Sequence, residues 1–161
     1  MELKPIYRVR FRYPHGWEVG LEGPLGREER HFYFAEGTCE GVIEGRFRGA
    51  NHPRRRTDAT AAMDLQGFIE TDDGALIMLD YQGYGRVFRK ERRQIAGAAW
   101  NTRQVVGAAW HTASDERYKW LNEAFCVITG EVRAPDRENY EQADVELMFQ
   151  VSELIWSPPP D

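Results

Sequence analysis

The chain has 161 residues, which is long enough to bury a hydrophobic core and suits a single domain. Hydrophobic residues make up 42% of it, charged residues 29%, and the net charge is -5. This composition excludes a disordered chain, and the acidic balance argues against nucleic acid as the main partner, because phosphate binding needs a basic surface.

The sequence favours neither a membrane protein nor a metalloprotein. It has no apolar stretch of spanning length and no signal-peptide core at its start, so we expect a cytoplasmic protein that does not bind membranes. Cys39 and Cys126 lie in strand-like runs and are expected to be buried thiols. Metal-ligand spacings, phosphate loops and nucleophile motifs are missing from the sequence. We therefore expect no metal and no cofactor.

The first strand is predicted by strict alternation over residues 6–13. Its apolar side carries Tyr7, Val9, Phe11 and Tyr13, and its other side carries three arginines. Pro14-His15-Gly16 is expected to end this strand, and residues 20–26, rich in glycine with one proline, predict a loop.

Further strands follow along the chain. Two are predicted at 29–35 and 41–50, separated by a break at Glu36-Gly37, and the polar segment 51–58 predicts a loop. In the second half we expect strands at 104–112, 125–132 and 144–154, and a short helix over 114–122 with Ser114 or Asp115 as its N-cap.

A β-hairpin over residues 64–85 is the strongest local prediction. Two strand-like runs flank Asp72-Asp73-Gly74, and Asp-Gly in a short connection is a strong hairpin signal. If Asp73-Gly74 forms a two-residue turn, alternation places one set of side chains on a common face. That set is Asp64, Gln66, Phe68, Glu70, Ile77, Leu79 and Tyr81. Because neither face is purely polar, we expect a sheet that curls around a pocket.

These elements predict an all-β fold. Eight or so strands without a long amphipathic helix indicate an antiparallel barrel or sandwich, and mixed polar and aromatic faces favour a barrel. We expect a single antiparallel β-barrel of about eight strands, with an internal pocket and one short helix. The barrel domain would span residues 1–156, and residues 157–161 would form a Pro-rich tail.

Proton-transferring side chains are the first group of candidate site residues. Histidine exchanges protons near neutral pH, and a carboxylate or phenol inside a barrel would be desolvated, which shifts its pKa. The catalytic candidates are His52, Asp64, Glu70, Tyr81 and Tyr84. The structural alternatives are a loop histidine bound to the backbone and carboxylates that face water.

The second group would bind a substrate. Arginine side chains can hold a carboxylate in a bidentate manner, and aromatic rings can stack on an aromatic ligand. The substrate-binding candidates are Arg54, Arg56, Phe68, Trp110, His111, Thr112, Trp120 and Asn122. Arg55 belongs to the same run, of which we expect most members to face solvent. Ordinary barrel packing would explain the aromatic residues equally well.

The order of motifs along the chain resembles the DUF3237 (UPF0311) family. The resemblance covers about residues 3–152 and rests mainly on Thr71-Asp-Asp-Gly-Ala75 and Arg117-Tyr-Lys-Trp-Leu-Asn122. It implies a closed antiparallel barrel with an internal pocket, and a role in the bacterial breakdown of lignin-derived aromatic compounds. The chain departs from the family pattern at Asn51-His52, where the family commonly has Asp-Trp.

Three functional hypotheses follow. The first is a cofactor-free enzyme that acts on a small aromatic or conjugated acid by decarboxylation, lyase chemistry or isomerisation. The second is a barrel that binds or carries a hydrophobic small molecule without catalysis. The third is a structural module whose exposed sheet edges assemble homo-oligomers.

Overall fold

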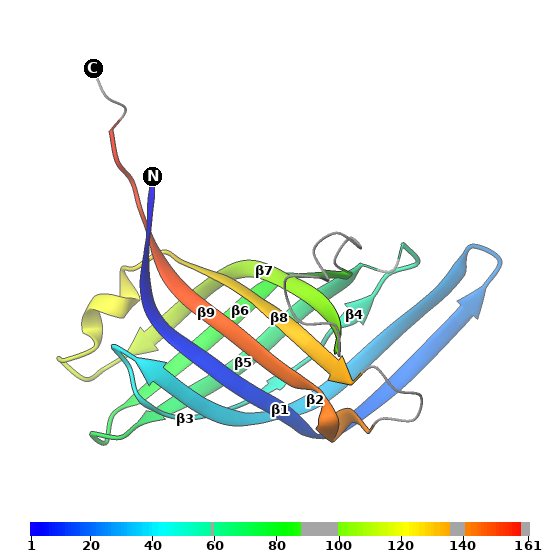
Figure 1. The fold of residues 1–161 in the computed structure, drawn as a ribbon, viewed down its shortest axis with the longest axis horizontal. Coiled ribbons are helices and arrows are strands. Elements are labelled where there is room, and N and C mark those ends of the chain that lie inside the picture. The colour runs from blue at the N-terminus through cyan, green and yellow to red at the C-terminus, as the bar shows by residue number, and fades with distance from the viewer. Residues whose placement is uncertain (59, 88–99, 136–140, 159–161) are drawn as a thin grey trace.

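The computed structural model describes residues 1–58, 60–87, 100–135 and 141–158. The last three residues of the expected tail lie outside this range. Within these ranges the chain forms nine strands and two short 3-10 helices (Figure 1). They are β1 (Glu2–Gly23), β2 (Gly26–Gly41), β3 (Gly45–Asn51), β4 (Arg54–Arg55), β5 (Ala61–Thr71), β6 (Leu76–Val87), β7 (Trp100–Ala113), η1 (Lys119–Asn122), β8 (Cys126–Pro135), η2 (Gln142–Asp144) and β9 (Glu146–Ile155).

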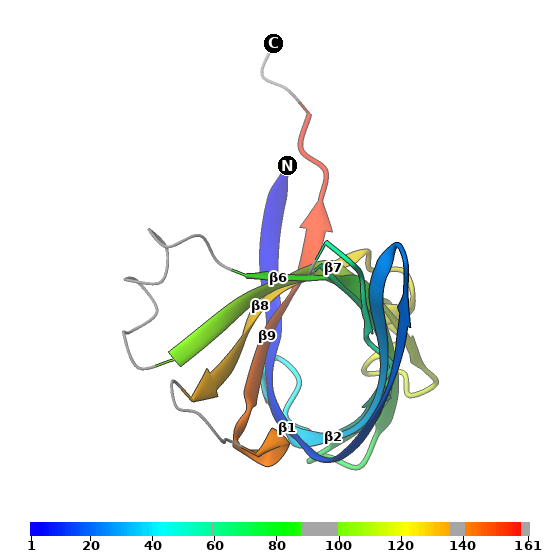
Figure 2. The same ribbon diagram turned by 90° about the vertical axis from the view of Figure 1, so that its right-hand side faces the viewer.

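The strands close into one antiparallel barrel, as the sequence predicts. They pair in the order β1-β9-β8-β7-β6-β5-β3-β2, and β2 pairs again with β1 to complete the ring. The two-residue strand β4 bridges β2 and β5. Seen from one end, the strands form a closed ring with both termini on the same side (Figure 2). A closed ring leaves no long unpaired edge along the barrel wall.

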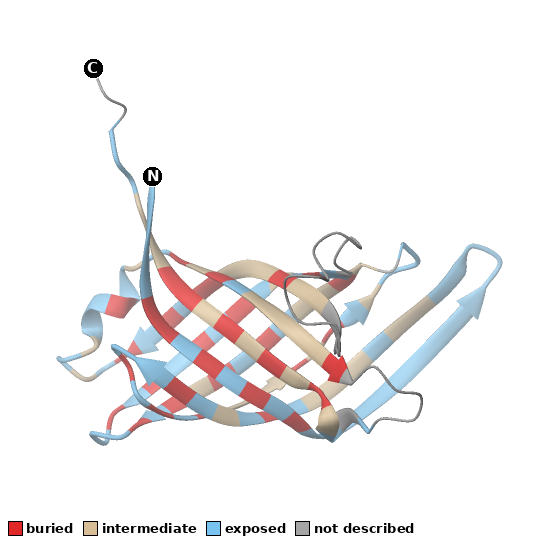
Figure 3. Ribbon diagram, viewed as in Figure 1, coloured by how far each residue is buried: buried red, intermediate tan, exposed pale blue. Residues whose placement is uncertain are grey.

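The core follows from period-2 alternation. The predicted apolar side of β1 is buried and its three arginines are exposed, which confirms the predicted pattern of this strand. On β9, Leu147, Phe149 and Val151 are buried in the same way. Figure 3 shows buried residues alternating with exposed or intermediate ones along the strands of the barrel. Cys39 and Cys126 are buried free thiols, as predicted.

The β1–β2 hairpin is longer than the sequence suggested. Residues 20–26 are not a loop, because β1 continues to Gly23 and β2 starts at Gly26. The expected break at Glu36-Gly37 is also wrong, since β2 runs through it. Glycine at position 37 allows the backbones of β1 and β2 to lie close together, because a Cβ on Gly37 would lie 1.9 Å from the carbonyl oxygen of Arg10. The far half of the hairpin therefore extends beyond the barrel (Figure 1).

The central hairpin exists, but its register differs by one residue from the predicted one. Glu70 pairs with Leu76 and Leu65 pairs with Tyr81, so three residues, Asp72 to Gly74, form the connection. Gly74 has φ of +89°, the left-handed residue that completes a three-residue turn. Since a shift by one residue reverses the faces of one strand relative to the other, Asp64, Gln66 and Glu70 lie outside while Ile77, Leu79 and Tyr81 lie inside.

One end of the barrel is closed by residues 114–124. Leu121 of η1 is buried, and Asn122 binds both the backbone N–H and the backbone oxygen of Ala113. The guanidinium of Arg117 and the hydroxyl of Tyr118 bind the Asp73 carboxylate at the hairpin turn. Neither Ser114 nor Asp115 caps the helix as predicted, because η1 begins later, after Tyr118. In the described part of the chain no helix is long and apolar enough to span a membrane.

Replacing Gly74 by alanine should lower the free energy of unfolding by about 1 kcal/mol, because an L-residue is disfavoured at positive φ. A Cβ at Gly74 meets nothing within 4 Å, so the cost comes from the backbone alone. Gly23 also has open space around it and no left-handed φ, so Gly23→Ala is the matched control and should be nearly neutral. Urea unfolding measures both variants, and equal losses would contradict the turn assignment.

Candidate functional site

A cavity of about 370 Å³ lies at the end of the barrel opposite η1, beside the projecting hairpin. This volume is at the lower end of the range of ligand pockets, roughly 300–1,000 Å³. Its lining comes from strands that are far apart in the sequence. The lining residues are Tyr13, Glu18, Glu29, His31, Tyr33, Pro53, Arg55, Ala61, Met63, Arg103, Val132, Ala134, Val145 and Leu147.

A β-bulge in β1 shapes the hairpin side of this cavity. The pairing with β2 shifts between Arg12 and His15. The residues of β1 that face inward are therefore odd-numbered before the bulge and even-numbered after it. Glu18 then lies directly opposite His31 on the same face. Gly16 lies opposite Tyr33, and a Cβ there would lie 2.1 Å from the Tyr33 ring, so the ring occupies the space that only glycine leaves.

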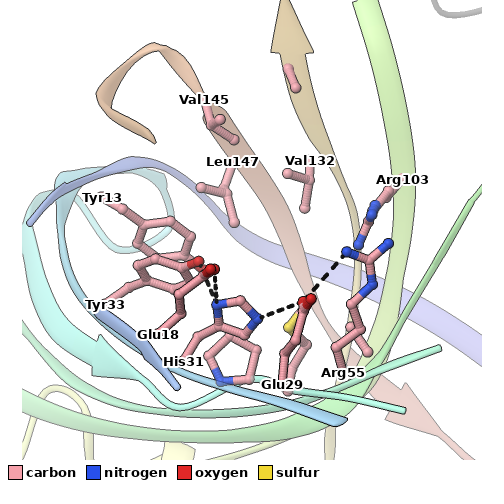
Figure 4. Close-up of a pocket in the computed structure, with 14 residues that line it drawn as sticks. Tyr13, Glu18, Glu29, His31, Tyr33, Arg55, Arg103, Val132, Val145 and Leu147 are labelled. Carbon is pink, nitrogen blue, oxygen red and sulfur yellow. Dashed lines mark hydrogen bonds and ion pairs between the residues drawn. The ribbon is translucent and has the colours of Figure 1, made fainter. Parts of the chain in front are cut away.

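Four side chains form a continuous polar chain along one side of the cavity (Figure 4). The hydroxyl of Tyr33 lies 2.9 Å from Nδ1 of His31, and Nε2 of His31 lies 3.6 Å from Oε2 of Glu29. That oxygen is 3.5 Å from the guanidinium of Arg55. We call these four residues, Tyr33, His31, Glu29 and Arg55, the polar chain. It is a phenol, an imidazole, a carboxylate and a guanidinium in series.

The imidazole of His31 lies between two carboxylates. Oε2 of Glu18 is 3.5 Å from Nδ1, on the side opposite Glu29. Glu29 is also held by Arg27, whose Nε is 3.0 Å from Oε1. The side chains of His31 and Glu29 are only 12% and 15% exposed, so these charges interact with less screening than on an open surface. The imidazole of His31 therefore has a carboxylate on each side.

Two neutral groups lie deeper than the polar chain. The Tyr13 ring stacks on the Tyr33 ring with centroids 4.6 Å apart, and Nδ2 of Asn51 donates to the Tyr13 hydroxyl at 2.6 Å. Tyr13 is 4% and Asn51 1% exposed. Burial raises the pKa of Tyr13 far above its ordinary value, against the smaller opposing effect of the Asn51 hydrogen bond. Tyr13 is therefore a neutral phenol at physiological pH.

The wall opposite the polar chain is aliphatic. Val132 and Ala134 come from β8, and Val145 and Leu147 come from the start of β9 and the residue before it (Figure 4). The cavity thus combines an apolar wall, which suits a hydrocarbon or aromatic ring, with a small number of polar groups that can fix its orientation. Charges gather toward the solvent side, where Glu18 and Arg55 have side chains 60% and 42% exposed.

Most of the sequence-predicted residues lie away from the cavity. Asp64 and Glu70 are exposed on the outer face, and Phe68 is half-buried on the same face. Glu70 is 3.7 Å from Arg48 there. The prediction placed them inside because it assumed the two-residue turn. In the observed register these three side chains lie on the outer face and do not contribute to a pocket inside the barrel.

The candidates of the 51–58 segment do not lie where the prediction placed them. His52 lies outside, with Nδ1 3.3 Å from the backbone oxygen of Asp64 and its ring against Phe32. Arg54 binds Glu28, and Arg56 is 3.9 Å from Asp58, both on the surface. Arg55, between them, lines the cavity. One arginine of the run therefore does face the pocket, but it is the middle one.

The aromatic and β7 candidates are mostly on the outer surface. Tyr84, Trp110 and Trp120 are exposed large side chains, and Thr112 is exposed too. They do not wall the cavity. Asn122 has the local structural role described above, in which its amide holds η1 against β7.

Tyr81 and His111 do lie inside the barrel, although neither lines the cavity. Nε2 of His111 is 2.6 Å from the Tyr7 hydroxyl, and burial lowers the pKa of His111 to about 4. Burial also raises the pKa of Tyr81 well above its usual value. Nδ1 of His111 and the Tyr81 hydroxyl have no hydrogen-bond partner among the described residues.

Sequence reasoning missed the β1–β2 half of the site. Glu29, His31 and Tyr33 alternate along one strand, which was the available signal. Glu18 was assigned to no element, and the loop predicted just after it hid its pairing with His31. Within the described residues, no group of three His, Cys, Asp or Glu is arranged to hold a metal ion.

The fold and its cavity define a class: closed antiparallel β-barrels with a lined cavity at one end. The family model described as "Protein of unknown function (DUF3237)" matches residues 1–152. The chain therefore belongs to the DUF3237 family, as its motifs predicted. A search of curated proteins gives no match.

Solved structures show the same fold. A β-barrel-like protein from Acinetobacter baumannii is 22% identical, with a TM-score of 0.68 and 94% of each chain covered. A protein of unknown function from Rhodopseudomonas palustris is 18% identical, with a TM-score of 0.72 and coverage of 96% of this chain and 97% of the other. An enzyme from Penicillium herquei is 16% identical, with a TM-score of 0.56 and 93% of each chain covered. At these identities the similarity shows the fold alone.

The buried His111 should make stability depend on pH. The unfolded chain binds a proton at this residue near pH 6.5, the folded protein only near pH 4. The free energy of unfolding should therefore fall as the pH is lowered through this window, by at most about 3 kcal/mol from this residue. His111→Gln keeps a partner for Tyr7 but does not titrate, so its unfolding energy should fall less between pH 6.5 and 4. Urea unfolding at each pH measures these energies. An equal fall in both proteins between pH 6.5 and 4 would contradict a role for His111 in the pH dependence.

Proposed function

We propose that the protein is a cofactor-independent enzyme that moves a proton on a small aromatic or conjugated acid, with decarboxylase, lyase or isomerase chemistry. The observation that supports this proposal is the polar chain, which faces an aliphatic wall in a cavity of small-molecule size. General acid–base catalysis needs a proton-exchanging group within hydrogen-bond reach of a bound molecule.

In this scheme Tyr33 and His31 handle the proton. We assign the hydrogen of the neutral imidazole to Nε2, toward Glu29, so that Nδ1 accepts from the Tyr33 hydroxyl. A proton that passes from the substrate to the Tyr33 oxygen can be matched by transfer of the Tyr33 proton to Nδ1. The imidazolium so formed lies between Glu18 and Glu29. The reverse sequence delivers a proton to the substrate.

Arg55 would hold the acid group. Its guanidinium has five N–H donors in a planar fork, so it can bind Glu29 and still present donors to a substrate carboxylate. The aliphatic wall would cover the ring. This scheme replaces Asp64, Glu70 and Tyr84 with His31 and Tyr33 as the residues expected to manage protons.

A non-catalytic carrier is the second candidate. Glu29 already forms ion pairs with Arg27, Arg55 and His31. Charged groups that are paired with one another can shape a binding pocket without taking part in a reaction, which favours a carrier. The two candidates differ in whether a bound acid is converted.

Arg55→Gln should weaken the binding of benzoate and cinnamate about tenfold or more, because it removes a charge-assisted contact to the carboxylate. It should leave the binding of the matching amides almost unchanged. Arg56→Gln removes the same charge from the neighbouring surface position and is the control. Calorimetric titration gives the affinities, and equal effects of the two substitutions would argue against an acid held by Arg55.

Catalysis is tested by turnover of an acid that binds. Tyr33→Phe and His31→Gln should each lower kcat by about 10²–10⁴, the usual contribution of general acid–base catalysis, with little change in affinity. His15→Gln alters a histidine exposed on the same hairpin and should leave kcat unchanged. Mass spectrometry of the reaction mixture detects product. If wild type binds the acids and converts none, the carrier is the correct reading.

A further inference from the structure

The projecting half of the β1–β2 hairpin has an apolar outer face. Its other face carries Glu18 and His31, which line the cavity, so the residues between them in each strand point outward. Phe32 lies directly opposite Trp17 on this outer face. The apolar residues there are Trp17, Val19 and Leu21 of β1 and Phe32 and Phe34 of β2, which we call the hairpin patch.

The hairpin patch is large for a surface that faces solvent. Trp17, Val19, Leu21, Phe34 and the tip residue Leu25 are 44–94% exposed. At roughly 200 Å² for each large apolar side chain, they present about 600 Å² of apolar surface. This is at the upper end of the largest patch on a typical monomer, and it approaches the roughly 800 Å² that each partner buries in a standard interface. Such a surface is typical of a contact with another molecule.

The outer face of the hairpin is complementary to itself. In the register of the hairpin, Val19 lies opposite Arg30 and Leu21 lies opposite Glu28. A second copy can pack face to face on the first with its strands reversed, so that a two-fold axis passes midway between these two levels. Val19 of each copy then meets Leu21 of the other, and Arg30 of each copy meets Glu28 of the other.

The charges favour this reversed arrangement. Glu28 pairs with Arg54 of its own chain at 2.8 Å, and its side chain is still 32% exposed. A carboxylate has about four acceptor sites, so it can bind a second guanidinium, which the exposed Arg30 of the other copy supplies. If the two hairpins instead pointed in the same direction, Arg30 of each copy would lie against Val19 of the other. A charge would then face an apolar side chain, which is unfavourable.

The shape of the chain also suits two reversed hairpins. The far half of the hairpin extends beyond the barrel, so the two barrels would lie at opposite ends of the pair (Figure 1). Leu25 at the tip of each copy then reaches the level between Trp17 and Phe34 of the other. The aromatic rings already form a cluster at that level, with ring centroids 5.9 Å apart for Trp17 and Phe34 and 5.3 Å apart for Phe32 and Phe34.

We propose that the protein forms an isologous homodimer in which the hairpin patches of two copies pack against each other with their strands reversed. This inference does not depend on the chemistry of the cavity. It does bear on the cavity wall, because Glu18, Glu29 and His31 lie on the opposite face of the same hairpin. The second copy would support that wall from behind.

Two equally exposed valines test the interface. Val19 is 65% and Val42 66% exposed, and Val42 lies outside the hairpin. Val19→Asp places a charge in the apolar centre of the contact and should raise the dissociation constant of the dimer about tenfold or more. Val42→Asp is the matched control and should leave this constant unchanged. Sedimentation velocity over a range of protein concentrations measures it, and circular dichroism shows whether each variant is folded.

The reversed arrangement is tested by exchanging charges. Arg30→Glu places a carboxylate against Glu28 of the other copy and should weaken the dimer about tenfold or more. Adding Glu28→Arg restores opposite charges and should recover most of the affinity. Arg54 lies opposite position 30, so the new glutamate keeps a cation beside it within its own chain. A dimer that the second substitution does not restore contradicts the reversed packing.

Three further results would overturn the inference. They are a monomeric wild type, a dimer that Val19→Asp and Val42→Asp affect equally, and an assembly of three or more copies, since an isologous patch is fully used in a dimer. If the monomer binds phosphatidylglycerol vesicles and Val19→Asp does not, a lipid surface covers the hairpin patch instead of a second copy.

Discussion

The site depends on one local constraint, the β-bulge between Arg12 and His15. Up to Arg12, β1 buries its odd-numbered residues in the barrel, and a regular continuation would have turned Trp17 inward and Glu18 outward. The bulge reverses the parity, so Glu18 faces His31 while Trp17 is exposed. Bulges are known to re-aim side chains next to functional sites. Here, a single extra residue converts a barrel strand into one wall of a polar cavity.

The two ends of the barrel perform different tasks. At the end with η1, Asp73 accepts hydrogen bonds from Thr71 and Tyr118 and pairs with Arg117, and Asn122 holds η1 to β7. These side chains belong to the two motifs on which the family resemblance mainly rests. Their contacts hold a hairpin turn against the segment that closes the barrel, so the two motifs stabilise the closed end of the fold. The cavity at the other end uses residues outside them.

Strand pattern was predictable where alternation is undisturbed. The stripes of β1 and β9, the all-β class and the existence of the central hairpin follow from local sequence. The register of that hairpin does not, because both a two-residue turn at Asp73-Gly74 and a three-residue turn ending at Gly74 satisfy the preference of glycine for positive φ. A difference of one residue decides whether Asp64 and Glu70 face water or the core. Likewise, Gly20 to Gly26 has the composition of a loop, and only pairing with β2 makes most of it a strand.

Desolvation explains how the polar groups are distributed along the cavity. The most deeply buried groups on this side of the barrel, Tyr13 of the cavity lining and its partner Asn51, are neutral, and burial keeps the Tyr13 phenol protonated. The charged groups of the polar chain are more exposed than Tyr13 and lie in opposing sets, with Glu29 between Arg27 and Arg55. An isolated charge at the depth of Asn51 would cost several kcal/mol, whereas a neutral hydrogen-bonding pair costs little once its partners are supplied. The same gradient must apply to any molecule that fills the cavity: its ionised group is held at the outer, cationic side, and its deep end can be polar only if it is neutral and hydrogen-bonded.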